Sequence, residues 1–174
     1  MMQRLLHFDM HALAAALDAE RMTRGLSWAQ MTAEINRPFE GTASLPISGT
    51  TLRGMTKKRS VTSAVVLQVL AWLGRTPESF LAGRVDAAAD AERLPDVGPG
   101  RILRLDTRAM YEALNARRAE REMTWKQVAK ELPGFTESML TNLASGPLIG
   151  FPRVMLLTQW VGRPAADFVR VRGA

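Results

Sequence analysis

The sequence predicts an all-α protein made of two tandem units, each with five short helices. One tryptophan motif, Ser27-Trp28-Ala29-Gln30-Met31, returns 97 residues later as Thr124-Trp125-Lys126-Gln127-Val128. A second motif, Ala71-Trp72-Leu73-Gly74-Arg75, returns 88 residues later as Gln159-Trp160-Val161-Gly162-Arg163. Rare tryptophans that recur in the same order indicate a duplicated unit. Apolar residues also follow helical spacing, and no alternating run bounded by hairpin residues stands out.

The two offsets differ by nine residues, so the first copy carries an insertion between the two motifs. The insertion falls within residues 37–47, which contain Pro38, Gly41 and Pro46. Because proline and glycine interrupt regular structure, this stretch is predicted to be a long loop rather than an added helix.

The duplication divides the chain into three parts. Residues 1–84 and 105–174 form the two units, each about the size that just supports its own core. Residues 85–104 form an acidic linker rich in proline and glycine. The connector from Gly83 to Gly100 would span about 55 Å when fully extended, which is enough for the two units to reach half-sites roughly 34 Å apart on one duplex.

The charge of the chain points to a polyanionic partner. It contains 23 Lys and Arg residues against 17 Asp and Glu, which gives a net charge of +6. Residues 1–84 carry +4 and residues 101–174 carry +5, whereas residues 85–100 carry −3. This balance favours nucleic acid or an anionic membrane surface, although an arginine-rich proteome would also produce basic proteins.

Composition narrows the class of protein. An apolar content of 47% is typical of a folded soluble chain, and no run is long enough to span a membrane. Charged and polar residues interrupt the first twenty positions, so we expect no signal peptide. The chain has no cysteine, which fits a reducing cytoplasm. We therefore expect a cytoplasmic protein without membrane contact.

The first helix of each unit begins after an aspartate. Asp9 and Asp106 are suited to cap a helix, because their carboxylates accept hydrogen bonds from free backbone N–H groups. Flanking apolar residues have the spacing of a hydrophobic staple, and each helix continues along one apolar face. The residues concerned are Phe8, Leu13 and Leu17 in the first unit and Leu105, Met110 and Leu114 in the second.

The second helix carries the strongest local signal. Ser27 and Thr124 are N-caps, and a glutamine follows each three residues later, which makes a capping box in both units. These helices are expected to end at residues that break or tolerate a break in helical structure. Those residues are Asn36 in the first unit and Pro133-Gly134 in the second.

The third and fourth helices supply most of each core. The third is expected to begin after Ser48 in the first unit and after Thr136 in the second. The fourth is apolar almost all round from Val65 to Leu73, as a core helix should be. The buried side of the third helix is predicted to be Leu52 and Met55 in the first unit and Leu140 and Leu143 in the second.

A fifth helix closes each unit. Gly74 and Gly162 supply the left-handed position that ends the fourth helix. Thr76-Pro77 and Arg163-Pro164 then begin the fifth, since proline fits the first turn of a helix. Phe80 and Phe168 are predicted to fold back into the core.

Three stretches of the first unit resemble the lambda-repressor-like helix-turn-helix family, also called the Xre family. Residues 26–31 look like the start of that family's second helix. Residues 50–55, followed by Lys57, Lys58 and Arg59, look like its recognition helix and basic tail. Residues 67–80 look like its closing helices. The resemblance covers about three quarters of the chain and is more specific for the fold than for the DNA site.

The resemblance implies that the third helix lies in the major groove and that the start of the second faces a phosphate. Two family positions for reading bases are glycines here, Gly49 and Gly54, so Thr50 and Arg53 become the expected base readers. The other expected DNA contacts of the first unit are Ser27, Trp28, Thr51, Lys57, Lys58 and Arg59, with the basic tail on phosphates.

The second unit departs further from the family pattern. Its third helix has no Lys or Arg and begins at Glu137, which a phosphate-rich surface would repel. Either this unit reads a weaker half-site, or it has lost DNA binding and serves dimerisation or a partner protein; we favour DNA contact by both units. Its expected contacts are Trp125, Lys126, Ser138, Thr141 and Asn142, with Asn142 suited to adenine.

These expectations describe a sequence-specific transcriptional regulator of double-stranded DNA, acting as a repressor in a bacterium or phage. The alternative is an antitoxin-like adaptor whose second unit binds a partner protein. No catalytic set is visible, so we expect no enzyme activity. No cofactor or small-molecule ligand is expected, and His7 and His11 lack a third partner for a metal. A homodimer of four units remains open.

Overall fold

The computed structural model describes residues 4–57, 61–83, 92–147 and 149–173. The described chain is mostly helical and adds one small antiparallel sheet of two strands. None of its helices is long and apolar enough to cross a membrane. The α-helices are α1 (Met10–Thr23), α2 (Trp28–Ile35), α3 (Gly49–Arg53), α4 (Ser63–Leu73), α5 (Thr107–Glu120), α6 (Trp125–Glu131), α7 (Glu137–Thr141) and α8 (Phe151–Val161), and the strands are β1 (Arg101–Leu105) and β2 (Val169–Gly173).

The predicted helix starts are confirmed. The carboxylates of Asp9 and Asp106 accept hydrogen bonds from backbone N–H groups of the first turns of α1 and α5, at 2.9 and 3.0 Å. Both capping boxes are formed: in each unit the cap hydroxyl accepts from the N–H of the glutamine, and the glutamine side chain accepts from the N–H of the cap residue. The local sequence alone therefore fixes where four of the helices begin.

The insertion in the first unit forms a loop, as predicted, with one short 3-10 turn at Arg37–Phe39. Asn36 ends α2 and closes this loop with its side chain. Its amide nitrogen donates to the carbonyl of Ile47 at 2.7 Å, and its amide oxygen accepts from the N–H of Ile47 at 2.8 Å. The two hydrogen bonds bring the chain back to the start of α3.

The all-α prediction is wrong in one respect, because β1 and β2 pair over five residues, from Arg101 with Gly173 to Leu105 with Val169. The alternation Val-Arg-Val-Arg at residues 169–172 is a strand signal, but its partner lies far along the chain and no hairpin turn joins them. Residues 101–104, which lie in the predicted linker, belong to β1. Residues 84–91 of the predicted linker lie outside the described residues.

The sheet has a shorter counterpart in the first unit. Phe8 and Leu81 form an isolated antiparallel bridge, and they occupy the positions of Leu105 and Val169 at the two sequence offsets. The N–H of the capping aspartate donates to the same carbonyl in both units: Asp9 to Phe80 at 2.8 Å and Asp106 to Phe168 at 2.7 Å. The sheet therefore extends a pairing that both units possess.

The ends of the two core helices agree with the prediction, whereas the fifth helices differ from it. Gly74 and Gly162 adopt left-handed conformations, with φ of 66° and 77°. The chain then forms single 3-10 turns, Pro77–Phe80 and Ala165–Phe168, instead of α-helices. Each turn has only four residues before the chain extends to pair with the segment ahead of α1 or α5. Phe80 and Phe168 are buried, as predicted.

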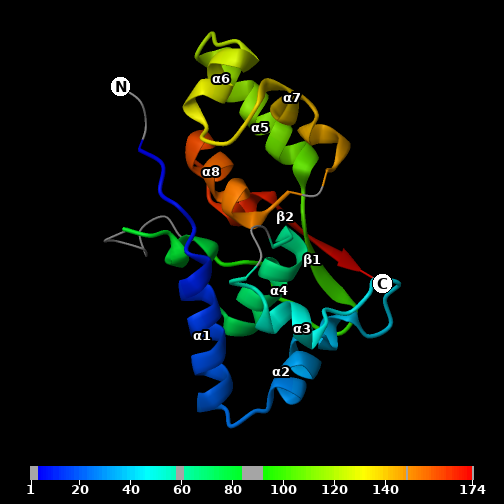
Figure 1. Cartoon of the computed structure of the whole chain (residues 1–174). Coiled ribbons are helices and arrows are strands. Elements are labelled where there is room, and N and C mark those ends of the chain that lie inside the picture. The colour runs from blue at the N-terminus through cyan, green and yellow to red at the C-terminus, as the bar shows by residue number, and fades with distance from the viewer. Residues whose placement is uncertain (1–3, 58–60, 84–91, 148, 174) are drawn as a thin grey trace.

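The two halves of the chain pack directly against each other. In Figure 1, α1 to α3 lie in the lower part, α5 to α7 in the upper part, and α4 and α8 between them. Hydrogen bonds cross this seam: the N–H of Phe151 donates to the carbonyl of Val61 at 3.2 Å, and the hydroxyl of Ser63 donates to the carbonyl of Ile149 at 2.8 Å. These contacts join the part of the chain before residue 84 to the part after residue 91.

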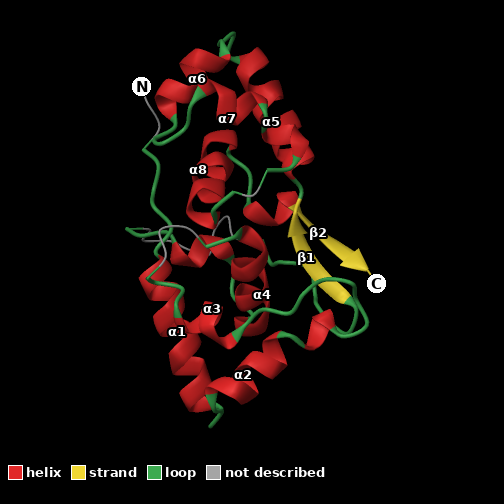
Figure 2. Cartoon of the chain, turned by 45° about the vertical axis from the view of Figure 1, so that its right-hand side comes forward, coloured by secondary structure: helices red, strands yellow, loops and turns green. Residues whose placement is uncertain are grey.

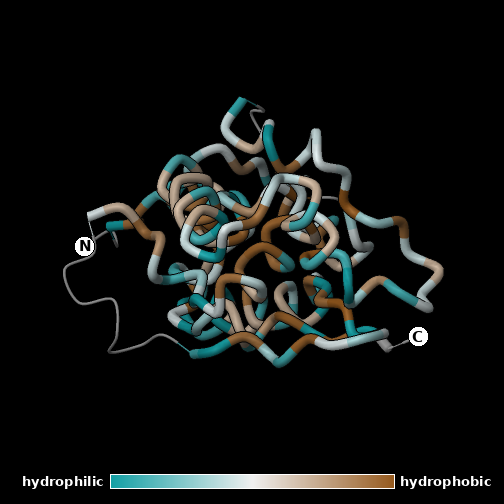
Figure 3. The backbone as a smooth tube through the Cα atoms, turned by 90° about the horizontal axis from the view of Figure 1, so that it is seen from below, coloured by the Kyte–Doolittle hydropathy of each residue, from teal (hydrophilic) through white to brown (hydrophobic). Residues whose placement is uncertain are grey.

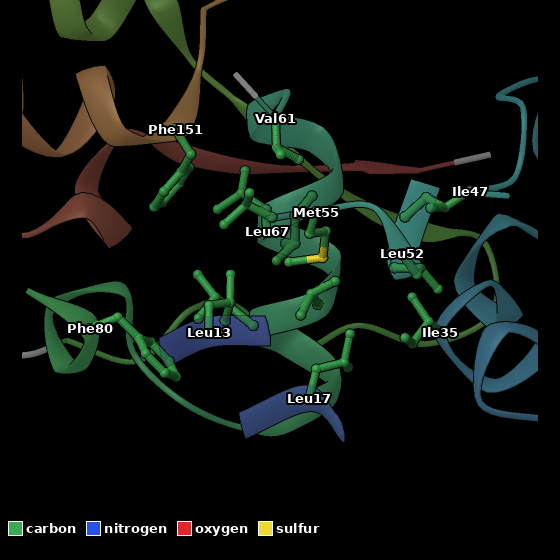
Figure 4. Packing of buried hydrophobic residues seen from close by; sticks show 14 of the residues in the cluster. Leu13, Leu17, Ile35, Ile47, Leu52, Met55, Val61, Leu67, Phe80 and Phe151 are labelled. Atoms are coloured by element: carbon green, nitrogen blue, oxygen red, sulfur yellow. The ribbon is translucent and has the colours of Figure 1, made fainter. Parts of the chain in front are cut away.

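One apolar cluster spans the seam. Phe151 and Met155 of α8 are buried with residues of the first half, and the ring of Phe151 lies 5.0 Å from that of Phe8. Figure 4 shows Phe151 beside Val61 and Leu67 in this cluster. Figure 3 shows hydrophobic segments concentrated inside the fold. Leu94 and Val97, from the second part of the predicted linker, pack against the same cluster.

Candidate nucleic-acid interface

The N-terminus of α3 and the outer side of α2 form a shallow exposed surface. Thr50 and Arg53 are exposed on it, as the expected base readers must be. The guanidinium carbon of Arg53 lies 5.3 Å from the ring centroid of Trp28, so the arginine side chain extends over the start of α2. The surface is lined by Trp28, Ala29, Thr32, Ala33, Gly49, Thr50 and Arg53.

Local interactions explain why α3 presents these two side chains. The hydroxyl of Ser48 caps the helix by accepting from the N–H of Thr51 at 3.1 Å, and Leu52 is buried beneath it. Because Leu52 faces the core, Thr50 and Arg53 face outward on this short helix. Thr51 is half-buried and its hydroxyl lies 2.8 Å from that of Ser48, so it is engaged in the cap.

Trp28 is held in place by Arg21. The Nη1 of Arg21 donates to the carbonyl of Leu26 at 2.9 Å, its Nε donates to Asp18 at 2.9 Å, and its guanidinium lies 5.2 Å from the Trp28 ring centroid. Trp28 is half-buried, so its main role is packing at the first turn of α2. The hydroxyl of Ser27 is exposed but accepts from the N–H of Gln30.

The second unit repeats this arrangement at the offset of 97. The Nη1 of Arg118 donates to the carbonyl of Met123 at 2.8 Å, and its guanidinium lies 5.2 Å from the centroid of Trp125. Asn115 takes the place of Asp18 and accepts from Arg118 at 3.0 and 2.8 Å. Trp125 also stacks on Tyr111 with centroids 5.5 Å apart. Trp28 and Trp125 are therefore each supported by an arginine in the same way.

The exposed face of α7 is polar, and most of its side chains form hydrogen bonds with neighbouring groups of the same segment. Lys126 is exposed at the first turn of α6, and Ser138, Thr141 and Asn142 are exposed on and just after α7. The amide nitrogen of Asn142 donates to the hydroxyl of Ser138 at 3.2 Å, and the hydroxyl of Thr141 donates to the Ser138 carbonyl. Asn142 caps the C-terminal end of α7 rather than lying within it.

The structure describes only the first residue of the predicted basic tail. Lys57 is exposed after α3, while Lys58 and Arg59 lie outside the described residues. The structure thus brings together Trp28, Thr50 and Arg53 on one surface, and Ser27 is the cap residue directly before Trp28. The expected residues of the second unit lie around α6 and α7, whose positions Figure 2 shows.

The sequence reasoning missed a cluster of arginines on the sheet. Arg104 of β1 and Arg170 and Arg172 of β2 line one hollow beside the starts of α4 and α5. Burial lowers the pKa of Arg104 from its ordinary value, and the charge of Arg172 lowers it further. The alternating Val-Arg-Val-Arg run was the one signal that could have revealed these residues.

Among the described residues, no three His, Asp or Glu side chains gather in a way that could hold a metal ion. A search of protein-family models, curated proteins and solved structures finds no match to this chain.

Proposed function

We propose that this protein is a sequence-specific regulator that binds double-stranded DNA through two tandem units of the lambda-repressor-like helix-turn-helix kind. The observation that carries the proposal is the exposed face of α3, where Thr50 and Arg53 lie beside the capped start of α2. The net charge of +6 supports it, since DNA is a polyanion.

The proposed mechanism assigns different tasks to the side chains. With α3 in the major groove, Arg53 donates to guanine or to a phosphate, and Thr50 contacts a thymine methyl group or a base acceptor. The start of α2 faces a phosphate, because a helix N-terminus attracts negative charge. Lys57 adds an exposed charge after α3 that contributes affinity without sequence choice. The protein then represses transcription by occupying its operator.

The tandem arrangement rests on contacts that recur in both halves. The capping boxes, the arginine-supported tryptophans and the hydrogen bonds from Asp9 and Asp106 occupy matching positions. Because α3 carries Arg53 and α7 carries no Lys or Arg, the two units would read unequal half-sites. A single chain would then bind a non-palindromic operator, which a symmetric dimer does not favour.

One observation favours a second candidate function. The helix α7 begins with an exposed Glu137 and has Ser138 bonded to Asn142 instead of free for bases. In this alternative, the second unit binds a partner protein or a second copy of the chain, and the whole acts as an antitoxin-like adaptor.

A mobility-shift assay over a salt series separates the two functions. The regulator should prefer one genomic fragment and bind it with steep salt dependence, and the double variant T50A/R53A should lose that preference. The variant R93A is the matched control, because Arg93 is exposed and lies near Gly74 at the far end of α4. Weak binding without fragment preference, unchanged in T50A/R53A, would favour the adaptor.

A further inference from the structure

Three arginines lie together at the seam between the two halves of the chain. Arg104, Arg170 and Arg172 line a hollow of about 270 Å³ beside β1 and β2. Figure 2 shows these two strands in yellow at one side of the molecule. The hydroxyl-bearing residues Thr62 and Thr107, at the starts of α4 and α5, line the same hollow. We call the three arginines the arginine seam.

Strand register forces these charges together. Arg104 pairs directly with Arg170 across the two strands, and Arg172 lies two residues further along β2, on the same face of the sheet. Like charges at directly opposed positions destabilise a sheet. Within the part of the chain that the structure describes, no ion pair includes any of the three. The cluster is therefore a concentration of positive charge without a described acidic partner.

The surroundings of the arginine seam suit an anion. Arg104 is half-buried, and its Nη1 donates to the carbonyl of Leu103 at 2.9 Å, which fixes the side chain. Arg170 and Arg172 are exposed and can turn toward a ligand. The positive end of α4 adjoins the hollow, and its cap residue Thr62 makes no side-chain capping hydrogen bond. Arginine forks bind phosphate oxygens in pairs, and an anion would relieve the repulsion between the strands.

The position of the hollow suggests where the phosphate belongs. It is bounded by Thr62, after α3, and by Gly146 and Pro147, after α7. Figures 1 and 2 agree that the sheet lies between the level of α3 and that of α7. Contacts to the DNA backbone between two recognition helices would fix the register of the protein on the duplex.

We infer that the arginine seam binds a phosphate group, and that in the DNA complex this group is a backbone phosphate between the two half-sites. The second part of this inference rests on the proposed function. The phosphate chemistry does not depend on it, because the same forks would bind a phosphorylated ligand in solution.

The first test uses inorganic pyrophosphate and the full-length protein, followed through backbone amide chemical shifts. Pyrophosphate should shift the amide signals of Thr62 and Thr107, and the variant R170Q/R172Q should lose these shifts. The control R75Q/R93Q removes the same charge near Gly74, at the other end of α4, about 16 Å away. Shifts that persist in R170Q/R172Q, or that never occur at the seam, would overturn the inference.

The second test measures duplex binding over a salt series. Each lost phosphate contact should reduce the slope of log affinity against log salt by roughly 0.9, so R170Q/R172Q should bind with a shallower slope than R75Q/R93Q. The variant R170K/R172K retains the charge without the forks and should keep the wild-type slope at lower affinity. An equal slope in R170Q/R172Q and the control would refute the backbone contact while leaving the proposed function intact. Seam binding of pyrophosphate without any duplex binding would instead reject the proposed function and DNA as the source of the phosphate.

Discussion

Thr62 and Gly150 form an antiparallel bridge with each other, and the 88 positions between them equal the offset of the second tryptophan motif. A residue that pairs with its own equivalent is the contact pattern that a local two-fold axis produces. Leu6 and Leu103, which are 97 residues apart, are each held by a glutamine, although the two glutamines are not at matching positions: the side chain of Gln68 accepts from the N–H of Leu103 at 2.8 Å, and that of Gln159 accepts from the N–H of Leu6 at 2.8 Å. Each half thus holds the segment that precedes the first helix of the other.

Because each half holds a segment of the other, we expect the whole chain to unfold in a single transition. Both halves contribute to one apolar cluster and share hydrogen bonds, and Leu5 of the first half packs against a second cluster formed by the second half. Neither half should therefore persist when the other is lost. The four indole N–H signals, two from each half, report this directly in a urea titration followed by NMR. A common midpoint is expected. Two well-separated midpoints, with Trp28 and Trp72 apart from Trp125 and Trp160, would refute the shared core.

The substitution Gln68→Leu should destabilise the protein by about 1–3 kcal/mol, because it leaves the N–H of Leu103 buried without an acceptor. Leucine has nearly the same size as glutamine, so little of the loss comes from a cavity. Chemical denaturation measures the change. The control is Gln127→Leu, whose side chain bonds an exposed N–H that water can satisfy, and which should lose less. Equal losses in both variants would show that burial of the Leu103 N–H is not the cause.

Removal of the Arg53 side chain should affect DNA binding and leave folding unchanged. Arg53 is exposed and reaches over Trp28, so Arg53→Ala should weaken binding to the preferred duplex by roughly 5- to 150-fold, the value of one good base contact. Fluorescence anisotropy measures the affinity, and thermal unfolding should give the wild-type midpoint. Wild-type affinity in Arg53→Ala would exclude this residue from the interface.

The loop ahead of α3 offers a test of positioning. Asn36→Ala removes two hydrogen bonds to Ile47 and should lower stability by about 1–3 kcal/mol, since each bond contributes about 0.5–1.5 kcal/mol. Because α3 begins directly after this closure, DNA affinity should fall as well. Glu40→Ala, an exposed change in the same loop, serves as the control and should alter neither property. A loss of stability with unchanged affinity would separate the loop closure from the orientation of α3.

The starts of α1, α2 and α3 and the end of α4 could be predicted because their signals are local. Asp9, Ser27 and Ser48 each cap a helix within three residues, and Gly74 ends one through its own backbone freedom. Each of these interactions involves neighbours in the chain, so the pattern of residue types is sufficient.

The contacts between the two halves could not be predicted from the sequence, because they join residues far apart in the chain. The pairing of β1 with β2 joins segments more than sixty residues apart, and the contact between Leu6 and Gln159 crosses nearly the whole chain. No turn motif in the sequence indicates that these distant segments pair. The arginine seam depends on them, because Arg104 approaches Arg170 only through the strand register. The family resemblance implied the roles of Thr50 and Arg53 on α3, whereas the hydrogen bond between Ser138 and Asn142 was not predicted.

Selection of bound duplexes from a random pool tests the proposed function most directly. If α3 and α7 both enter the major groove from a rigid seam, the enriched duplexes should contain two dissimilar half-sites at one constant spacing. The half-site read by α3 should show the stronger preference and should weaken in Arg53→Ala. A pool without enrichment, or half-sites at freely varying spacing, would contradict that picture.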